Sequence, residues 1–202
     1  MSYNITYLIL TGGESRRFGS PKMEAVLNGK SLLAHIVDGI PNESEIIVAG
    51  PIPKNLSRGV HQVTEKISFG GPVSGISHGL TLVTTDYVAV IATDVPFGGG
   101  AIDVLKKDLS TKFDAFIPID RQGSLQYLSS IFNANKLREA IANLNSPLNA
   151  SLKILVKSLR VKEIAFAEWD SYLLKDIDTQ KDLSDAESCL TDTVKRLEIR
   201  AL

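Results

Sequence analysis

A short apolar strand followed at once by a glycine-rich, basic loop constrains this chain more than any other feature. Ile5–Leu10 is largely apolar. The next residues include three glycines and three cations: Gly12, Gly13, Gly19, Arg16, Arg17 and Lys22. Glycines let backbone N–H groups approach anionic oxygens closely, and cations add charge at the same turn. The pattern predicts a phosphate-binding loop, although a tight turn with solvated surface cations is compatible with the same residues.

The two commonest phosphate-binding signatures do not match this loop. The dinucleotide pattern Gly-x-Gly-x-x-Gly needs glycines at other spacings from Gly12. Gly29-Lys30-Ser31 imitates the end of a Walker A loop, but Glu24 stands where the first glycine of that loop belongs. The sequence therefore requires a third kind of phosphate loop.

Beyond the loop, short apolar runs alternate with helical patterns, which is typical of an α/β fold. We expect strands at Ile5–Leu10, Glu45–Ala49, His61–Thr64, Tyr87–Ala92 and Ala115–Pro118, with helices at Leu32–Gly39, Ser74–Leu82 and Ala101–Leu109. Further on we expect strands at Tyr127–Phe132, Val161–Phe166 and Tyr172–Lys175, and helices at Asn135–Leu144, at Ala150–Ser158 and after Thr179. Right-handed βαβ units then predict a three-layer α/β/α sandwich with a mostly parallel, Rossmann-like sheet.

Composition narrows the class of ligand. The 202 residues with 44% hydrophobic content suit a single domain. A formal net charge of −1 gives no broad basic field, so we expect no nucleic-acid partner. Cys189 is the one cysteine, no apolar run approaches the length of a membrane helix, and Ile5–Leu10 is too short for a signal peptide. We expect a cytoplasmic monomer or weak oligomer that binds small anions and no membrane.

The order of the strands predicts where the ligand lies. In a doubly wound sheet the first and fourth predicted strands are neighbours, and ligands bind beyond their carboxyl ends. Gly12 follows the first of these strands and Asp94 follows the other. We expect the Asp94 carboxylate to lie beside the phosphate loop, where hard oxygen ligands suit Mg²⁺. An aspartate after a strand is also a common helix N-cap.

Four stretches agree in order and spacing with the motifs of one family. The first loop matches Leu-x-Gly-Gly-x-Ser-x-Arg-x-Gly-x-x-Lys at Leu10, Gly12, Gly13, Ser15, Arg17, Gly19 and Lys22. The other three are Gly71-Pro72-Val73-Ser74-Gly75-Ile76, Thr93-Asp94-Val95-Pro96-Phe97, where the family has Cys-Asp-x-Pro-Phe, and Asp176–Leu183. With these motifs the chain resembles the molybdenum cofactor guanylyltransferases (MobA-like nucleotidyltransferases) over residues 5 to about 186.

The resemblance implies transfer of GMP from GTP to the terminal phosphate of molybdopterin, with release of pyrophosphate and with Mg²⁺ as cofactor. It implies Lys22, Arg17 and Asp94 as catalytic residues, and Asp94 and Asp178 as metal ligands. The implied nucleotide-binding residues are Leu10, Thr11, Gly12, Gly13, Ser15, Lys22, Ala49, Glu65, Gly71, Pro72 and Gly75. The implied acceptor-binding residues are Gln126, Lys153 and Asp176. Residues 1–120 would then form the nucleotide-binding half of one domain, and residues 121–202 the acceptor-binding half.

Departures from the family pattern leave alternatives open. Glycine at position 12 favours GTP over CTP, since relatives that use cytosine tend to have alanine there. Glu65 is assigned to the guanine base, but a surface charge at a strand end explains it equally well. Acidic residues at 176 and 178 replace two family asparagines, which leaves another phosphorylated acceptor, such as a sugar or polyol phosphate, open. Asp178 is also a candidate helix cap. A non-catalytic nucleotide-binding relative is a further alternative, against which the intact Lys22 and Asp94 argue.

Overall fold

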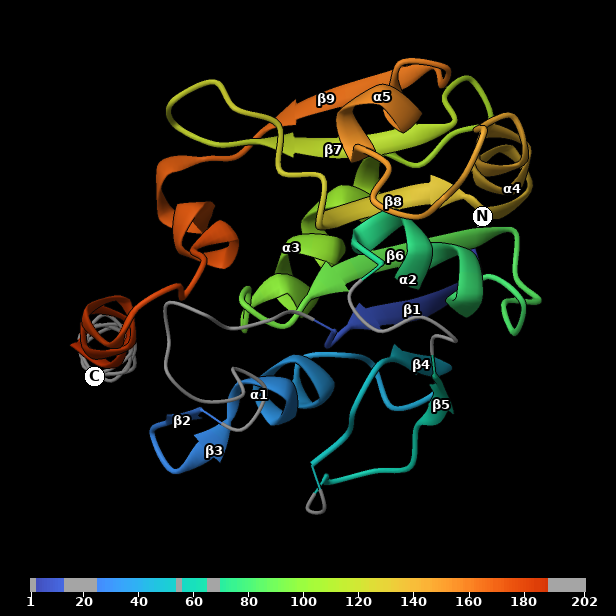
Figure 1. Ribbon diagram of the computed structural model, residues 1–202. Coiled ribbons are helices and arrows are strands. Elements are labelled where there is room, and N and C mark those ends of the chain that lie inside the picture. The colour runs from blue at the N-terminus through green and yellow to red at the C-terminus, as the bar shows by residue number, and fades with distance from the viewer. Residues whose placement is uncertain (1–2, 13–24, 54–55, 65–69, 189–202) are drawn as a thin grey trace.

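A seven-stranded sheet organises the protein, seen in a computed structural model that describes residues 3–12, 25–53, 56–64 and 70–188 (Figure 1). The strand order is β5-β4-β1-β6-β8-β7-β9. The strands are β1 (Ile5–Leu10), β4 (Ile46–Ala49), β5 (His61–Val63), β6 (Tyr87–Ala92), β7 (Ala115–Ile119), β8 (Ser129–Asn133) and β9 (Val161–Ala165). In this sheet β8 runs antiparallel to both neighbours, and the other pairs are parallel.

Helices cover both faces of the sheet, as the predicted three-layer α/β sandwich requires. The helices are α1 (Leu32–Asp38), α2 (Pro72–Gly79), α3 (Gly98–Leu105), α4 (Ala134–Ala142) and α5 (Leu152–Val156), with a further helix over 180–188. Two short 3₁₀ helices, η2 (Lys106–Asp108) and η3 (Glu168–Leu174), follow α3 and β9. The α/β sandwich with a mostly parallel sheet is therefore confirmed. Within the described parts of the chain, no helix is long and apolar enough to cross a membrane.

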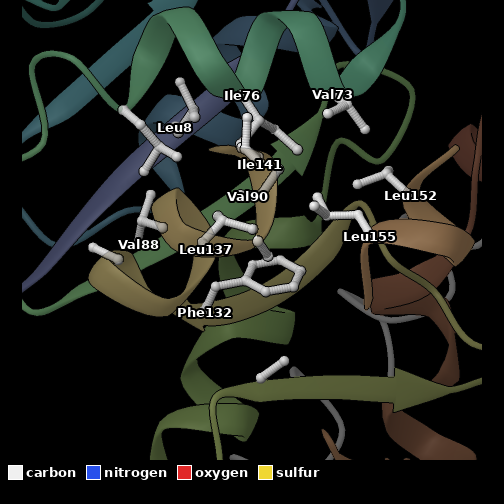
Figure 2. Packing of buried hydrophobic residues seen from close by; sticks show 14 of the residues in the cluster. Leu8, Val73, Ile76, Val88, Val90, Phe132, Leu137, Ile141, Leu152 and Leu155 are labelled. Carbon is white, nitrogen blue, oxygen red and sulfur yellow. The ribbon is translucent and has the colours of Figure 1, made fainter. Parts of the chain in front are cut away.

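The strand β1 lies inside the sheet, between β4 and β6, and is buried on both faces. Its side chains alternate between two cores, because successive residues of a strand point to opposite faces. Tyr7 and Ile9 pack in the core beneath α1 and α3, and Leu8 packs in the core beneath α2 and α4. Figure 2 shows the second core, in which Leu8 lies below Ile76 of α2. Burial on both faces explains why β1 is a nearly continuous apolar run.

Two segments differ from the sequence-based expectation. The prediction of a strand at Tyr172–Lys175 is wrong, since these residues follow or belong to η3, whose Leu173 and Leu174 pack against Ala101 of α3. An unexpected hairpin of β2 (Val26–Leu27) and β3 (Lys30–Ser31) turns at Asn28-Gly29, which both have positive φ. Such a turn is typical of a two-residue hairpin and not of a Walker A loop.

The late part of the chain crosses the carboxyl edge of the sheet. The arrowheads of β6, β7 and β9 point to the left in Figure 1, where η3 and the last described helix also lie. There Ile177 and Ala186 are buried with Ala25, Leu27 and Leu32, next to the hairpin and α1. Residues from both ends of the sequence therefore pack together at the edge where ligands bind in α/β proteins.

The close approach of α1 and α3 gives a test of this packing. A methyl group on Gly99 of α3 would lie 2.7 Å from the carbonyl oxygen of Gly39, which ends α1. We expect Gly99→Ala to lower the free energy of unfolding by about 1–3 kcal/mol, despite the better helix propensity of alanine. The control is Gly59→Ala, whose methyl group meets no heavy atom within 4 Å. Urea unfolding measures both, and equal stability of the two variants would contradict the packing described.

Candidate functional site

The ends of β1 and β6 bring two predicted site segments together. Leu10 pairs with Ala92 of β6 on one side and with Ala49 of β4 on the other. Gly12 and Asp94 thus follow neighbouring strands, each two residues beyond a paired residue. Adjacent strands lie about 4.8 Å apart. The first residues of the predicted phosphate loop therefore lie next to the predicted metal ligand, Asp94, at the carboxyl edge of the sheet.

A hydrogen bond from the late turn reaches the same place. The backbone N–H of Ile177 donates to the carbonyl oxygen of Asp94 at 2.8 Å. Ile177 is fully buried, so this contact has a fixed apolar anchor. Asp176 and Asp178 flank it in sequence. The structure therefore brings the Asp176–Asp178 turn against the Asp94 turn, as the resemblance implied.

Capping of the last described helix does not depend on Asp178. The Thr179 hydroxyl accepts the backbone N–H of Asp182 at 3.2 Å, and the Asp182 carboxylate accepts the backbone N–H of Thr179 at 2.7 Å. This reciprocal pair is a capping box with Thr179 as the N-cap. The hydrogen bond from the Thr179 hydroxyl holds the pKa of Asp182 below its usual value. The Asp178 carboxylate was a candidate for metal binding and for helix capping. Thr179 caps the helix, so metal binding is the candidate role that stays for Asp178.

The start of α2 presents the second glycine motif. Gly71 is the N-cap residue with φ +81°, a conformation that favours glycine, and Pro72 begins the helix. Gly75 is buried in the helix. Asn149, itself at φ +55°, lies against Gly71 and donates its backbone N–H to the carbonyl oxygen of Gly70 at 2.6 Å. The segment before α5 therefore covers the N-terminus of α2.

The predicted acceptor residues do not form one cluster in the described structure. Gln126 follows the β7–β8 turn and donates its side-chain amide to the Asp120 carboxylate at 2.7 Å. Backbone N–H groups of the same turn, chiefly that of Ser124, hold the pKa of Asp120 low. Lys153 is exposed on α5, whereas Asp176 lies next to the Asp94 contact. Asp176 is thus the acceptor candidate that the hydrogen bond of its sequence neighbour places beside Asp94.

Several predicted residues lie outside the described parts of the chain: Gly13, Ser15, Arg17, Lys22 and Glu65. Of the described nucleotide-binding candidates, Leu10 and Ala49 contribute backbone atoms to the strand ends. Among the described residues, no three His, Cys, Asp or Glu side chains gather as a metal cluster. The described part of the site therefore consists of glycine turns with the Asp94 and Asp176–Asp178 segments.

Gly50 belongs to this edge and directly follows Ala49, one of the implied nucleotide-binding residues. Its φ is +122°, and a Cβ atom there would lie 2.6 Å from the Thr11 hydroxyl oxygen and 2.9 Å from the Gly12 nitrogen. No side chain fits in that space, so the end of β4 requires glycine. The Ala-Gly-Pro sequence directly after an apolar strand was the available signal.

Solved structures share this fold over most of the chain. Molybdopterin-guanine dinucleotide biosynthesis protein A from Archaeoglobus fulgidus matches with a TM-score of 0.71 and 19% identity, over 93% of this chain and 99% of that one. The 2-C-methyl-D-erythritol 4-phosphate cytidylyltransferase from Thermus thermophilus matches with a TM-score of 0.67 and 18% identity, over 91% and 98%. The fold is that of the α/β nucleotidyltransferases.

Sequence comparison identifies the family. The pattern of the MobA-like NTP transferase domain matches residues 7–162. A probable molybdenum cofactor guanylyltransferase from Natranaerobius thermophilus is 26% identical over 209 residues, which cover 96% of this chain and 100% of that relative. The chain belongs to the MobA-like NTP transferase domain family, and the resemblance predicted from the four motifs is confirmed.

The capping box predicts that two adjacent residues have different effects on stability. Thr179→Ala removes the cap hydroxyl and should lower the free energy of unfolding by about 1 kcal/mol. Asp178→Asn keeps its backbone N–H, which donates to Asp182 at 3.1 Å, and should leave the melting temperature almost unchanged. Thermal unfolding of both variants followed by circular dichroism tests this. A larger loss of stability in Asp178→Asn would reverse the assignment of the cap.

Proposed function

We propose that this protein transfers GMP from GTP to the phosphate of molybdopterin and releases pyrophosphate. The family consists of nucleotidyltransferases, and the Natranaerobius relative bears the name of a probable molybdenum cofactor guanylyltransferase. The observation that carries the proposal is the hydrogen bond between Ile177 and Asp94. It joins a turn of the proposed acceptor half, residues 121–202, to a turn of the proposed nucleotide half, residues 1–120. Transfer between two substrates needs them side by side.

The chemistry proposed is a displacement at the α-phosphorus of GTP. A phosphate oxygen of the acceptor forms the new bond to phosphorus, the bond to the β-phosphate oxygen breaks, and pyrophosphate leaves. A phosphate monoester is largely ionised at neutral pH, so no general base is required. Positioning and charge stabilisation then account for most of the catalysis. We assign the stabilisation of the α-phosphate and of the departing pyrophosphate to Arg17 and Lys22.

The described residues fit a Mg²⁺ ion held by Asp94 and Asp178. Mg²⁺ in nucleotide sites commonly takes one or two carboxylates together with phosphate oxygens. The Ile177 contact keeps the backbones of both aspartates near one another, and Thr179 leaves the Asp178 carboxylate out of the helix cap. Bound there, the ion would supply positive charge that neutralises the phosphates.

A second acceptor class has a specific observation in its favour. The solved relative from Thermus thermophilus is by its name a cytidylyltransferase for a polyol phosphate, and it shares the fold over most of the chain. Asp176 and Asp178 also make the late turn more acidic than the family pattern. A hydroxylated acceptor can donate hydrogen bonds to such carboxylates. A sugar or polyol phosphate is therefore the alternative acceptor.

An assay of pyrophosphate release separates the candidates. The purified chain with Mg²⁺ is given each of GTP, CTP, ATP and UTP, first with molybdopterin and then with 2-C-methyl-D-erythritol 4-phosphate. We expect release with GTP and molybdopterin and formation of the guanine dinucleotide product. Equal or faster reaction with CTP would overturn the guanylyl assignment. Nucleotide binding by calorimetry without release for either acceptor would favour a non-catalytic relative.

The two proposed metal ligands should respond differently to Mg²⁺. Asp94→Asn should nearly abolish transfer at any Mg²⁺ concentration, because the carboxylate of Asp94 is the proposed main ligand of the ion and Asp94 follows the strand next to β1. Asp178→Asn should shift the Mg²⁺ titration of activity to higher concentration. Asp103→Asn is the control, since Asp103 is exposed on α3 and pairs with Lys106 at 2.8 Å. An unaltered titration in Asp178→Asn would leave Asp94 as the single proposed carboxylate ligand.

Nucleotide choice should depend on Gly12. A glycine lets the backbone approach the nucleotide closely, so a methyl group there crowds a purine more than a pyrimidine. We expect Gly12→Ala to lower kcat/KM for GTP by about tenfold and to leave that for CTP less affected, a loss typical of one misfitting group. Steady-state kinetics with both nucleotides measures the ratio. An unchanged ratio would remove Gly12 from nucleotide selection.

A further inference from the structure

Two buried threonines tie the end of β1 to both neighbouring strands. Thr11 is 9% exposed and Thr93 is 6% exposed, and they stand next to Gly12 and Asp94. Thr11 occupies a position that the family signature leaves open, and Thr93 replaces a family cysteine. We propose that their hydroxyl groups form a threonine clamp, Thr11 and Thr93, which positions the Gly12 turn and Asp94 relative to each other. This inference rests on the proposed function, because the clamp acts on the transfer site.

The first half of the clamp joins β6 to β1. The Thr93 hydroxyl donates to the carbonyl oxygen of Leu10 at 2.6 Å, and the Thr93 backbone N–H donates to the same oxygen at 3.1 Å. A carbonyl oxygen has two lone pairs, so two donors from one residue satisfy it fully. Thr93, which directly precedes Asp94, thereby holds Leu10, the last residue of β1, with two hydrogen bonds.

The second half joins β1 to the end of β4. The Thr11 hydroxyl donates to the carbonyl oxygen of Pro51 at 2.7 Å, and its backbone N–H donates to that of Ala49 at 3.0 Å. The side-chain amide of Gln62 donates to the carbonyl oxygen of Gly50 at 2.8 Å, which fixes the turn that receives Thr11. The chain is therefore held on both sides beyond the last paired residue of β1.

The clamp lies where small displacements matter most. A misplacement of about 1 Å between reacting groups can lower the rate by about 10²-fold. Gly12 and Asp94 leave the sheet directly after the clamp residues, so any shift of a strand end moves one of them relative to the other. β-Branched side chains have few χ1 rotamers, which keeps each hydroxyl directed at its acceptor. Thr11 and Thr93 are thus positioning residues and not catalytic residues.

Valine substitutions test the clamp, because valine keeps the shape of threonine without the hydroxyl. We expect Thr93→Val to lower kcat by about tenfold and to raise the Mg²⁺ requirement, since it releases the Asp94 turn. We expect Thr11→Val to raise KM for the nucleotide by about tenfold, since it releases the Gly12 turn. Thr93→Ser and Thr11→Ser keep the hydroxyl and should stay within about threefold of the wild type.

The opposite edge of the same two strands offers a matched control. The Thr85 hydroxyl, before β6, donates to the Tyr87 carbonyl oxygen at 2.7 Å and accepts the backbone N–H of Thr6 on β1 at 3.1 Å. Thr85→Val removes a comparable bridge far from the carboxyl edge. It should lower the melting temperature as the clamp variants do, while kcat and KM stay at wild-type values.

Amide hydrogen exchange tests the clamp without measuring the reaction. Amide hydrogen exchange is measured on the protein without nucleotide. The backbone amide of position 93 should exchange faster in Thr93→Val, and that of position 11 should exchange faster in Thr11→Val. The serine variants should restore slow exchange at both positions. Faster exchange with no transfer by the wild type would support the clamp and refute the proposed function. Two results would overturn the clamp. One is amide exchange in the valine variants that is as slow as in the wild type, and the other is a change of kcat and KM in these variants no larger than in Thr85→Val.

Discussion

The parallel pairing of β1 with β6 fixes where the groups of the candidate site lie, because it matches Leu10 with Ala92. From that register, Gly12 after β1 and Asp94 after β6 leave the sheet at the same level. Both strands are buried on both faces, so a shift of one residue would turn every inward side chain to the opposite core. The apolar packing that stabilises the fold therefore also sets the geometry of the site.

Much of the sheet was predictable from the sequence. The bounds of β1 and β6 agree with the predicted runs, because strands covered on both faces are continuous apolar segments with clear ends. The error at Tyr172–Lys175 has a physical cause. Leu173 and Leu174 are adjacent and both buried against α3, a pattern that a short 3₁₀ helix gives as readily as a strand. Tertiary contact with α3 decides between the two, and the sequence does not contain it locally.

The candidate site was predictable as a set of segments but not in its detailed contacts. Asp178 is a residue type that caps helices, so the sequence left open whether it caps the helix over 180–188 or binds a metal ion. The reciprocal hydrogen bonds of Thr179 and Asp182 assign the cap to Thr179. The Ala-Gly-Pro sequence signals a turn at Gly50 but not the close contacts that require glycine there, because these come from Thr11 and Gly12, which follow a different strand. Such contacts depend on chain segments far apart in sequence.

The bond between Ile177 and Asp94 also concerns the order in which the protein is synthesised. A growing chain is made from its N-terminus, and its earlier parts can begin to fold before the rest exists. The strands β1, β4 and β6 can therefore pair while the chain is still on the ribosome. The turn that reaches Asp94 comes from the last part of the described chain. A growing chain can thus have the ends of β1 and β6 paired and still lack the late turn, so the site is complete only after that turn has been synthesised.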